Sequence, residues 1–411
     1  MDIAFFLAFL AGGPASAGQT SAPVPEADLP TLVRGNTGFA IDLFEMLRDG
    51  DPDGNLFFSP YSISAALGMT YAGARGGTGE QMAAVLQFTL PPERLHQAFA
   101  LLEERLGAEY RARLSSSGTE GLLTLEVANA LWVQQSFRIL DSYRRIVEAR
   151  YHAEARSVDF EMDPEGSRQL INDWVAERTA DRIMDLLAPG TIDDQTRVVI
   201  TNAIYFKGSW MSQFDQHLTR DGEFTTPGGS TVTVPMMRQT RWYPCAMTEG
   251  CTAISLPYSD GLSSMLVLLP DGDLGQFERD LDPEVLERIA GRLQSTDVDL
   301  SMPRFEFTRA FSLHDVLKDM GMPDAFDSSA DFSGITGQRD LFISDVIHKA
   351  FVKVDETGTE AAAATAVVMA LGCASPTRPV RVVLDRPFLF LIRDEVTGSI
   401  LFMGRVADPT E

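Results

Sequence analysis

The chain has 411 residues, 45% of them hydrophobic, and its mean hydropathy is −0.03, so it is long and apolar enough to bury a large core. Its 34 Lys and Arg residues are outnumbered by 58 Asp and Glu residues. The resulting formal net charge of −24 argues against binding to nucleic acid or to an anionic membrane surface, and it favours a protein partner.

The first residues resemble an export signal. Residues 3–11 form an apolar run and residues 15–17 resemble a cleavage site, so residues 1–17 are a candidate signal peptide of a secreted or periplasmic protein. Asp2 stands where such signals carry a positive charge, which keeps a cytoplasmic location open. Residues 18–29 are predicted to be a flexible lead-in. No later stretch is apolar for about 18 residues, so we expect no membrane span.

Helix signals dominate the first half of the chain. Ser59 followed by Pro60 is typical of a helix N-terminus, and it predicts an apolar helix as far as Gly68. We interpret the Gly-rich segment 73–79 as a loop that ends this helix and not as a phosphate-binding loop, because it follows a helix and not a strand. Amphipathic helices are also predicted at Leu95–Arg113 and at Ser167–Ala180, the second with Ile171, Trp174 and Val175 on its buried side.

Strand signals dominate the second half. Apolar runs bounded by turn residues predict strands at 198–206, 264–269, 388–392 and 400–403. Helices followed by strands, without an internal repeat, indicate an α+β fold with mostly antiparallel sheets.

Three cysteines allow one disulfide at most. Cys245 and Cys251 flank a turn-like segment, so they either pair across a hairpin in an oxidising compartment or remain two buried thiols. Cys373 is left over, and an exposed thiol there would be reactive. The sequence has no Cys/His spacing typical of a metal site, so we expect no metal.

Motifs of known catalytic machinery are missing from the sequence. It contains no GxSxG, HExxH or GxxxxGK(S/T) segment, and its five histidines do not lie in nucleophile motifs. We therefore expect no enzymatic activity and no cofactor.

The small-residue stretch 358–368 is the most informative segment. In a strand, Thr359 and the alternate residues up to Val367 would share one face, and Glu360 would lie on the other. The four consecutive alanines also permit a helix. That helix would have almost no polar face between Ala361 and Leu371, so we favour a loop that can insert into a sheet as a strand.

Four ordered segments resemble the serpin family. They are Asn55–Ser64, Thr201–Trp210, His348–Ala363 and the ending Arg386–Val406. The resemblance implies an α+β serpin fold with three β-sheets and eight or nine helices. It also implies a single domain over 30–409 and an exposed reactive-centre loop at about 357–385. None of the five asparagines begins an Asn-x-Ser/Thr glycosylation site, which fits a bacterial member.

Serpin resemblance also implies a mechanism. A target serine protease attacks the loop and forms an acyl-enzyme, and the cut loop then inserts into the main sheet and traps the protease. The expected state is an inhibitory monomer. Two alternatives stay open: a non-inhibitory carrier or chaperone, and an inhibitor of cysteine proteases that uses the same loop.

By the same resemblance, Glu356 is the acid at the start of the hinge and Arg304 is its ion-pair partner. Ser59, Ser62, Asn202 and His348 match the polar cluster beneath the point where the sheet opens, and Trp210 matches the aromatic residue under the insertion site. The remaining hinge residues are Gly358, Thr359, Glu360, Ala361, Ala362 and Ala363.

Family spacing, 16 residues on from Glu356, places the reactive bond between Gly372 and Cys373, with Leu371 and Cys373 as alternatives for the residue before the bond. These residues suit proteases with small or hydrophobic primary pockets, such as elastase-, chymotrypsin- or subtilisin-like enzymes. Glycosaminoglycan activation is not expected, because the arginines of the predicted helix 95–113 are interleaved with glutamates.

Overall fold

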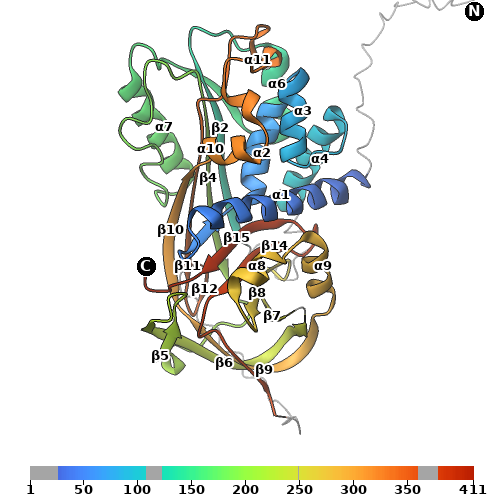
Figure 1. Cartoon of the computed structure of the whole chain (residues 1–411), viewed down its shortest axis with the longest axis vertical. Helices are drawn as coiled ribbons and strands as arrows, with labels where there is room; N and C mark the ends of the chain where they lie inside the picture. The colour runs from blue at the N-terminus through green and yellow to red at the C-terminus, as the bar shows by residue number, and fades with distance from the viewer. Residues whose placement is uncertain (1–25, 108–122, 249, 360–377) are drawn as a thin grey trace, which may run out of the picture.

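The computed structural model describes residues 26–107, 123–248, 250–359 and 378–411. Two hydrogen-bonded sheets run through the molecule, with most helices gathered at one end and β5, β6 and β9 at the other (Figure 1). The described helices are α1 (Asp28–Gly50), α2 (Pro60–Tyr71), α3 (Gly76–Val85), α4 (Pro92–Leu106), α6 (Asp141–Tyr151), α7 (Pro164–Arg178), α8 (Leu274–Arg279), α9 (Pro283–Gly291), α10 (His314–Met320) and α11 (Ser333–Thr336), with 3-10 turns η1 (Gln216–Leu218) and η2 (Pro323–Phe326).

The six-stranded sheet has the order β10-β11-β12-β4-β2-β3. Most of its neighbours pair antiparallel, while β11 with β4 and β2 with β3 pair parallel. Its strands are β10 (Phe305–Ser312), β11 (Asp345–Val354), β12 (Gly358–Thr359), β4 (Val198–Ser209), β2 (Thr124–Gln134) and β3 (Glu154–Val158).

The second sheet has nine described strands, because the long strand β6 continues from one group of strands into another. β6 pairs with β5 at its beginning, with β9 along most of its length and with β7 at its end. The third sheet implied by the sequence is therefore continuous with the second in the described residues. The strands, in spatial order, are β1 (Leu56–Phe58), β15 (Ile400–Val406), β14 (Phe388–Asp394), β8 (Ser263–Pro270), β7 (Cys251–Pro257), β6 (Thr231–Thr248), β9 (Gln294–Pro303) and β13 (Val380–Val383), with β5 (Arg220–Thr225) beside β6.

Helices cover both faces of the six-stranded sheet at β2 and β4. Ile171, Trp174 and Val175 of α7 are buried as predicted, and they belong to a cluster that includes Trp132 of β2 and Val199 of β4. On the other face α2 packs against β2, β4 and β15, and all its residues from Pro60 to Thr70 are buried. Both faces are thus covered by helices at β2 and β4, whereas alternate residues of β10, such as Glu306 and Thr308, are exposed.

Two predicted helix boundaries were wrong. The helix predicted at Leu95–Arg113 begins at Pro92 and ends at Leu106, just before Gly107. The Gly-rich segment predicted to be a loop forms the first turn of α3 from Gly76 onward, although glycine is a poor helix former. Burial of Met82 and Val85 explains this outcome, because tertiary packing outweighs the weak propensity of the first turn.

The two described cysteines are buried thiols, and no disulfide joins them. In the β6–β7 hairpin Cys245 lies opposite Ile254, whereas Cys251 lies opposite Thr248. This offset of three residues corresponds to about 10 Å along the strands, beyond the usual reach of a disulfide. Burial raises the pKa of the Cys245 thiol. No described helix combines the length and apolarity that crossing a bilayer would require.

Candidate functional site

The candidate site lies where β11 and β4 separate. From Asp345 to Ala350, β11 pairs directly with β4 in parallel register. Beyond this point β12 lies between them and pairs antiparallel with both. Thr359 is the pairing partner of Val354 on one side and of Gly208 on the other. The first two residues after the turn at 355–357 therefore already form a strand inside the sheet.

Close packing fixes both residues of β12. A Cβ atom on Gly358 would lie 2.1 Å from the Gly208 carbonyl oxygen, so only glycine fits this backbone position. The Thr359 side chain is 2% exposed and points inward, as the expected alternation requires. Its Oγ1 shares a hydrogen bond of 2.8 Å with the hydroxyl of Tyr258. The other hinge residues, Glu360, Ala361, Ala362 and Ala363, lie outside the described residues, as do Leu371, Gly372 and Cys373.

Residues 355–357, which we call the hinge turn, are held by the segment after β4. The Trp210 indole N–H donates to the Asp355 carbonyl, and its backbone N–H donates to the Thr357 carbonyl, each at 2.9 Å. The Trp210 ring stacks on Tyr258 with the ring centres 4.9 Å apart. Because Tyr258 also bonds Thr359, one aromatic pair supports both the turn and β12.

Glu356 is buried at the centre of the hinge turn. Its side chain is 2% exposed, whereas its partner Arg304 is 42% exposed. Nε and Nη2 of Arg304 donate to Glu356 Oε1 at 2.8 and 2.6 Å, and the Thr219 hydroxyl donates to the same oxygen. Burial opposes ionisation of the carboxyl group, but the Arg304 and Thr219 hydrogen bonds outweigh it and hold the pKa of Glu356 below its ordinary value.

A second set of predicted residues forms a buried polar row across three strands. Asn202 of β4 lies opposite Asn129 of β2 and opposite His348 of β11. The Asn202 amide donates to the Ser62 hydroxyl and to Asn129 Oδ1, while Asn202 Oδ1 bonds His348 Nδ1. This row joins β2, β4 and β11 within the stretch where β11 and β4 pair directly, two residues before that pairing ends at Ala350.

Ser59 connects the polar row to the second sheet. Its backbone N–H donates to His348 Nε2 at 3.2 Å, and its hydroxyl donates to the Leu401 carbonyl of β15 at 2.6 Å. Burial lowers the pKa of His348 to about 3, so the ring is neutral at physiological pH. Since Nε2 accepts from Ser59, the proton is on Nδ1, which donates to Asn202. The row is thus completely neutral.

The structure divides the predicted opening cluster into two groups. Ser59, Ser62, Asn202 and His348 belong to the polar row, whereas Trp210 and Arg304 contact the hinge turn. Sequence reasoning missed three further members, Asn129, Thr219 and Tyr258. Asn129 carries a detectable signal, because it is the polar residue on a strand face that otherwise holds Leu131 and Val133.

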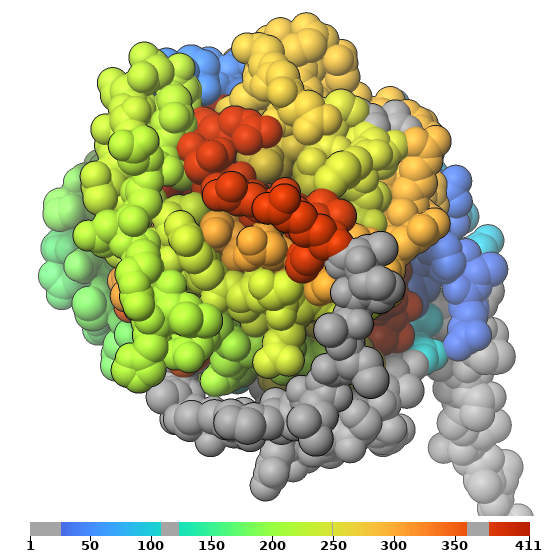
Figure 2. Space-filling model, turned by 90° about the horizontal axis from the view of Figure 1, so that it is seen from below, coloured from blue at the N-terminus to red at the C-terminus, as the bar shows by residue number. Residues whose placement is uncertain are grey.

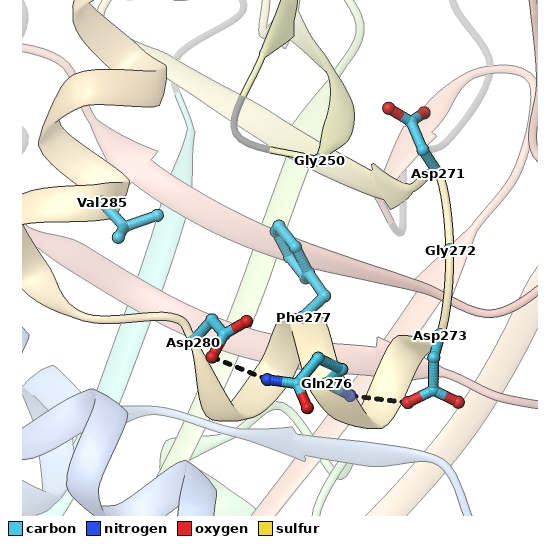
Figure 3. A pocket seen from close by; sticks show the side chains of 8 residues that line it. All are labelled: Gly250, Asp271, Gly272, Asp273, Gln276, Phe277, Asp280 and Val285. Atoms are coloured by element: carbon cyan, nitrogen blue, oxygen red, sulfur yellow. Dashed lines mark hydrogen bonds between the residues drawn. The ribbon is translucent and has the colours of Figure 1, made fainter.

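A separate hollow of about 440 Å³ lies beside α8 (Figure 3). Two of its three carboxylates have local structural partners: Asp273 accepts from the Gln276 backbone N–H, and Asp280 accepts from the Gln276 side chain. Phe277 rises into the hollow from the same helix. Among the described residues, no group of three or more His, Cys, Asp or Glu side chains is arranged to hold a metal ion.

The described arginines of α4 form ion pairs with residues near the start of α1. Arg94 bonds both carboxylate oxygens of Asp28, and Arg105 lies 2.9 Å from Glu26. These pairs reduce the positive charge that α4 offers to a polyanion.

Comparison with known proteins identifies the family. The family model described as "Serpin (serine protease inhibitor)" matches residues 34–409. The chain belongs to the serpin family. This serpin is 39% identical to the leukocyte elastase inhibitor of Bos taurus over 392 residues, which are 92% of this chain and 99% of the relative. It is also 39% identical to an uncharacterized serpin-like protein of Thermococcus kodakarensis, over 92% of this chain and 86% of that protein.

Solved structures show the same fold. Human thyroxine-binding globulin in complex with thyroxine superposes on this serpin with a TM-score of 0.83 at 32% identity, over 93% of this chain and all of that one. The α+β serpin fold expected from the sequence is therefore confirmed. Within this fold β11, β12 and β4 are the strands at which the candidate site lies.

Proposed function

We propose that this serpin inhibits serine proteases as a suicide substrate. One observation carries the proposal: β12, which directly precedes the rest of the loop, already lies between β11 and β4 and pairs with both. The relative in Bos taurus is named as an elastase inhibitor, which supports protease inhibition as the activity.

In the proposed reaction the protease's serine oxygen attacks the carbonyl carbon before the reactive bond. The peptide C–N bond breaks, the protonated amine of the next residue leaves, and an ester joins the inhibitor to the protease. Further insertion from Thr359 by about 15 residues, at ~3.3 Å each, would carry the ester roughly 50 Å along the sheet. The distorted protease then fails to complete hydrolysis, and both proteins remain linked.

Insertion requires the polar row to open. Adding a strand between β11 and β4 separates them by one further strand spacing of about 4.8 Å. The hydrogen bond between His348 and Asn202 then breaks, together with the direct pairing from Asp345 to Ala350. Neutral partners lower the cost of this step, because no buried charge loses its counter-ion.

The proposed targets have small or hydrophobic primary pockets, with Gly372, Leu371 or Cys373 before the reactive bond. We also propose a single domain over 30–409, a monomeric state and a cleaved export signal at 1–17. N-terminal sequencing of the mature protein tests the signal, because an intact Met1 in the exported fraction contradicts it.

A protease panel tests the inhibitor function. The purified chain is mixed with an elastase, chymotrypsin, subtilisin, trypsin and a papain-type cysteine protease, and products are resolved on denaturing gels. A covalent band with one of the first three supports the proposal, and mass spectrometry of the released C-terminal peptide then locates the reactive bond. If the loop is cleaved but no enzyme gives a covalent band, the result supports a non-inhibitory serpin instead. A covalent band with the papain-type protease alone supports an inhibitor of cysteine proteases.

A further inference from the structure

We propose that this serpin contacts its target protease through a second surface beside the loop, formed by Met211, Arg238, Trp242 and Arg381. This Trp242 surface rests on the proposed function, because it needs a protease that attacks the loop. Its role is to bind the protease before the bond is cut and so to select among enzymes with similar primary pockets.

Exposed apolar side chains form the centre of the surface. Trp242 is 64% exposed and Met211 is 55% exposed, and both line one small hollow with Trp210 and Pro257. Leaving a tryptophan in water forgoes a large apolar contribution to folding. Trp and Arg are also the residue types that contribute most to protein interfaces, so their combination here indicates a docking surface.

A continuous series of contacts places this surface between the two described ends of the loop. At the first end, the Trp210 N–H bonds the Thr357 carbonyl, and Met211 follows directly in sequence. At the second end, Val380 of β13 pairs with Val298 of β9, which pairs with Arg241 of β6. Both described ends of the loop therefore border this face, so a protease bound to the loop could contact it.

Figure 2 looks onto this end of the molecule. The red segment that contains β13 crosses the exposed face, and yellow-green residues of the β5 and β6 region lie beside it. The strand register places β9 between β6 and β13 in one sheet, and the picture shows the β13 segment and the β6 region on the same face.

Charge distinguishes this surface from the rest of the chain. On the outer side of the sheet Thr240, Asp299 and Arg381 form one row across β6, β9 and β13. On this side the exposed Arg238, Arg378 and Arg381 outnumber the half-buried Asp297 and Asp299, although the whole chain has a net charge of −24.

The positive charge of the Trp242 surface indicates which kind of protease would bind it. A protease with an acidic rim around its catalytic cleft would be attracted to this face and repelled by the remaining surface, which orients its approach. A second copy of this chain is a poor occupant, because a two-fold contact would bring the same arginines together.

Binding to an inactive protease tests the surface without requiring inhibition. The probe is the panel protease that cleaves the loop fastest, with its catalytic serine replaced by alanine. Trp242→Ala should raise the Kd for the inactive protease about tenfold. Replacing both Arg238 and Arg381 by Glu should slow association about tenfold at low salt and reduce its salt dependence.

Two control variants test exposed side chains elsewhere. Met162→Ala removes an apolar side chain that is 83% exposed, and Arg138→Glu reverses an exposed charge at the far end of β2. Both should bind the probe as the unaltered chain does. A Kd for Trp242→Ala within twofold of the unaltered chain, or equal losses in the controls, would overturn the proposal. Covalent-complex yield with the active protease is measured separately, so failure of inhibition and failure of the surface are distinguishable.

Discussion

The Thr359 hydroxyl is hydrogen-bonded to the Tyr258 hydroxyl inside the six-stranded sheet, 2.8 Å away. Tyr258 is completely buried and stacks on Trp210, which in turn holds the hinge turn. The start of the hinge is therefore anchored by a side-chain contact in addition to strand pairing.

Thr359→Arg should convert the proposed inhibitor into a substrate. The guanidinium would have to occupy a site where the native side chain is 2% exposed, and an unpaired buried charge is strongly unfavourable. We expect the number of inhibitor molecules consumed per protease to rise more than tenfold, measured by titrating residual activity. Thr359→Val, which keeps the shape, is the control. Equal complex yields for Arg and Val would contradict the inward position during insertion.

Glu356→Gln should destabilise the hinge turn in a pH-dependent manner. The folded-state pKa of Glu356 is lowered, so the unfolded chain binds the proton more readily. The stabilisation is complete above the ordinary value of 4.5 and is lost as the pH falls through the folded-state value.

Thermal unfolding of both chains at several pH values measures this effect. At pH 7 we expect Glu356→Gln to be less stable by about 1–3 kcal/mol, since Arg304 keeps partial access to water. The two chains should converge at the acid end of the range. A constant difference between pH 7 and pH 3 would show that the carboxylate charge is not responsible.

His348 predicts a second acid-sensitive contribution. Burial lowers its pKa from 6.5 to about 3, so its contribution to stability is complete above pH 6.5 and is lost as the pH falls toward 3. In urea unfolding from pH 8 to pH 4, the free energy of unfolding should fall more steeply with decreasing pH for the unaltered chain than for His348→Gln. Parallel pH profiles would contradict a neutral buried imidazole.

Gly358→Ala should expel β12 from the sheet. The added methyl group would meet the Gly208 carbonyl oxygen at 2.1 Å, so the backbone of the hinge must move away from β4. We expect faster amide hydrogen exchange at Gly358 and Thr359 and a loss of about 1–3 kcal/mol of stability. Gly228→Ala, where a Cβ atom would meet nothing within 4 Å, is the matched control. Unchanged amide hydrogen exchange would indicate that β4 moves to accommodate the methyl group and that β12 stays in the sheet.

Local signals allowed much of the fold to be predicted. Ser59 marked the start of α2, and the Ser59 hydroxyl does accept from the Ser62 N–H. The apolar face of α7 was also found, because its spacing alone determines which side is buried. The start of α3 at Gly76 was missed, since long-range packing and not residue propensity stabilises that helix.

The site depended on contacts between distant segments. The family resemblance identified Glu356 and Arg304. The residues next to them in the sequence give no sign that the Glu356 carboxylate is buried or that it also accepts a hydrogen bond from Thr219. Tyr258 was missed because a single tyrosine after a strand has no distinctive pattern. Its importance arises only where β7, β4 and the hinge meet.

Because Gly358 and Thr359 already lie in the sheet, the register of the strand is set early. Since the side chains of a strand alternate, the inward position of Thr359 determines which later residues would enter the core, and a slip by one residue would bury Glu360. In the proposed mechanism the register of the inserted strand is therefore set before a protease binds, so the chain would need no search for alignment while the ester exists.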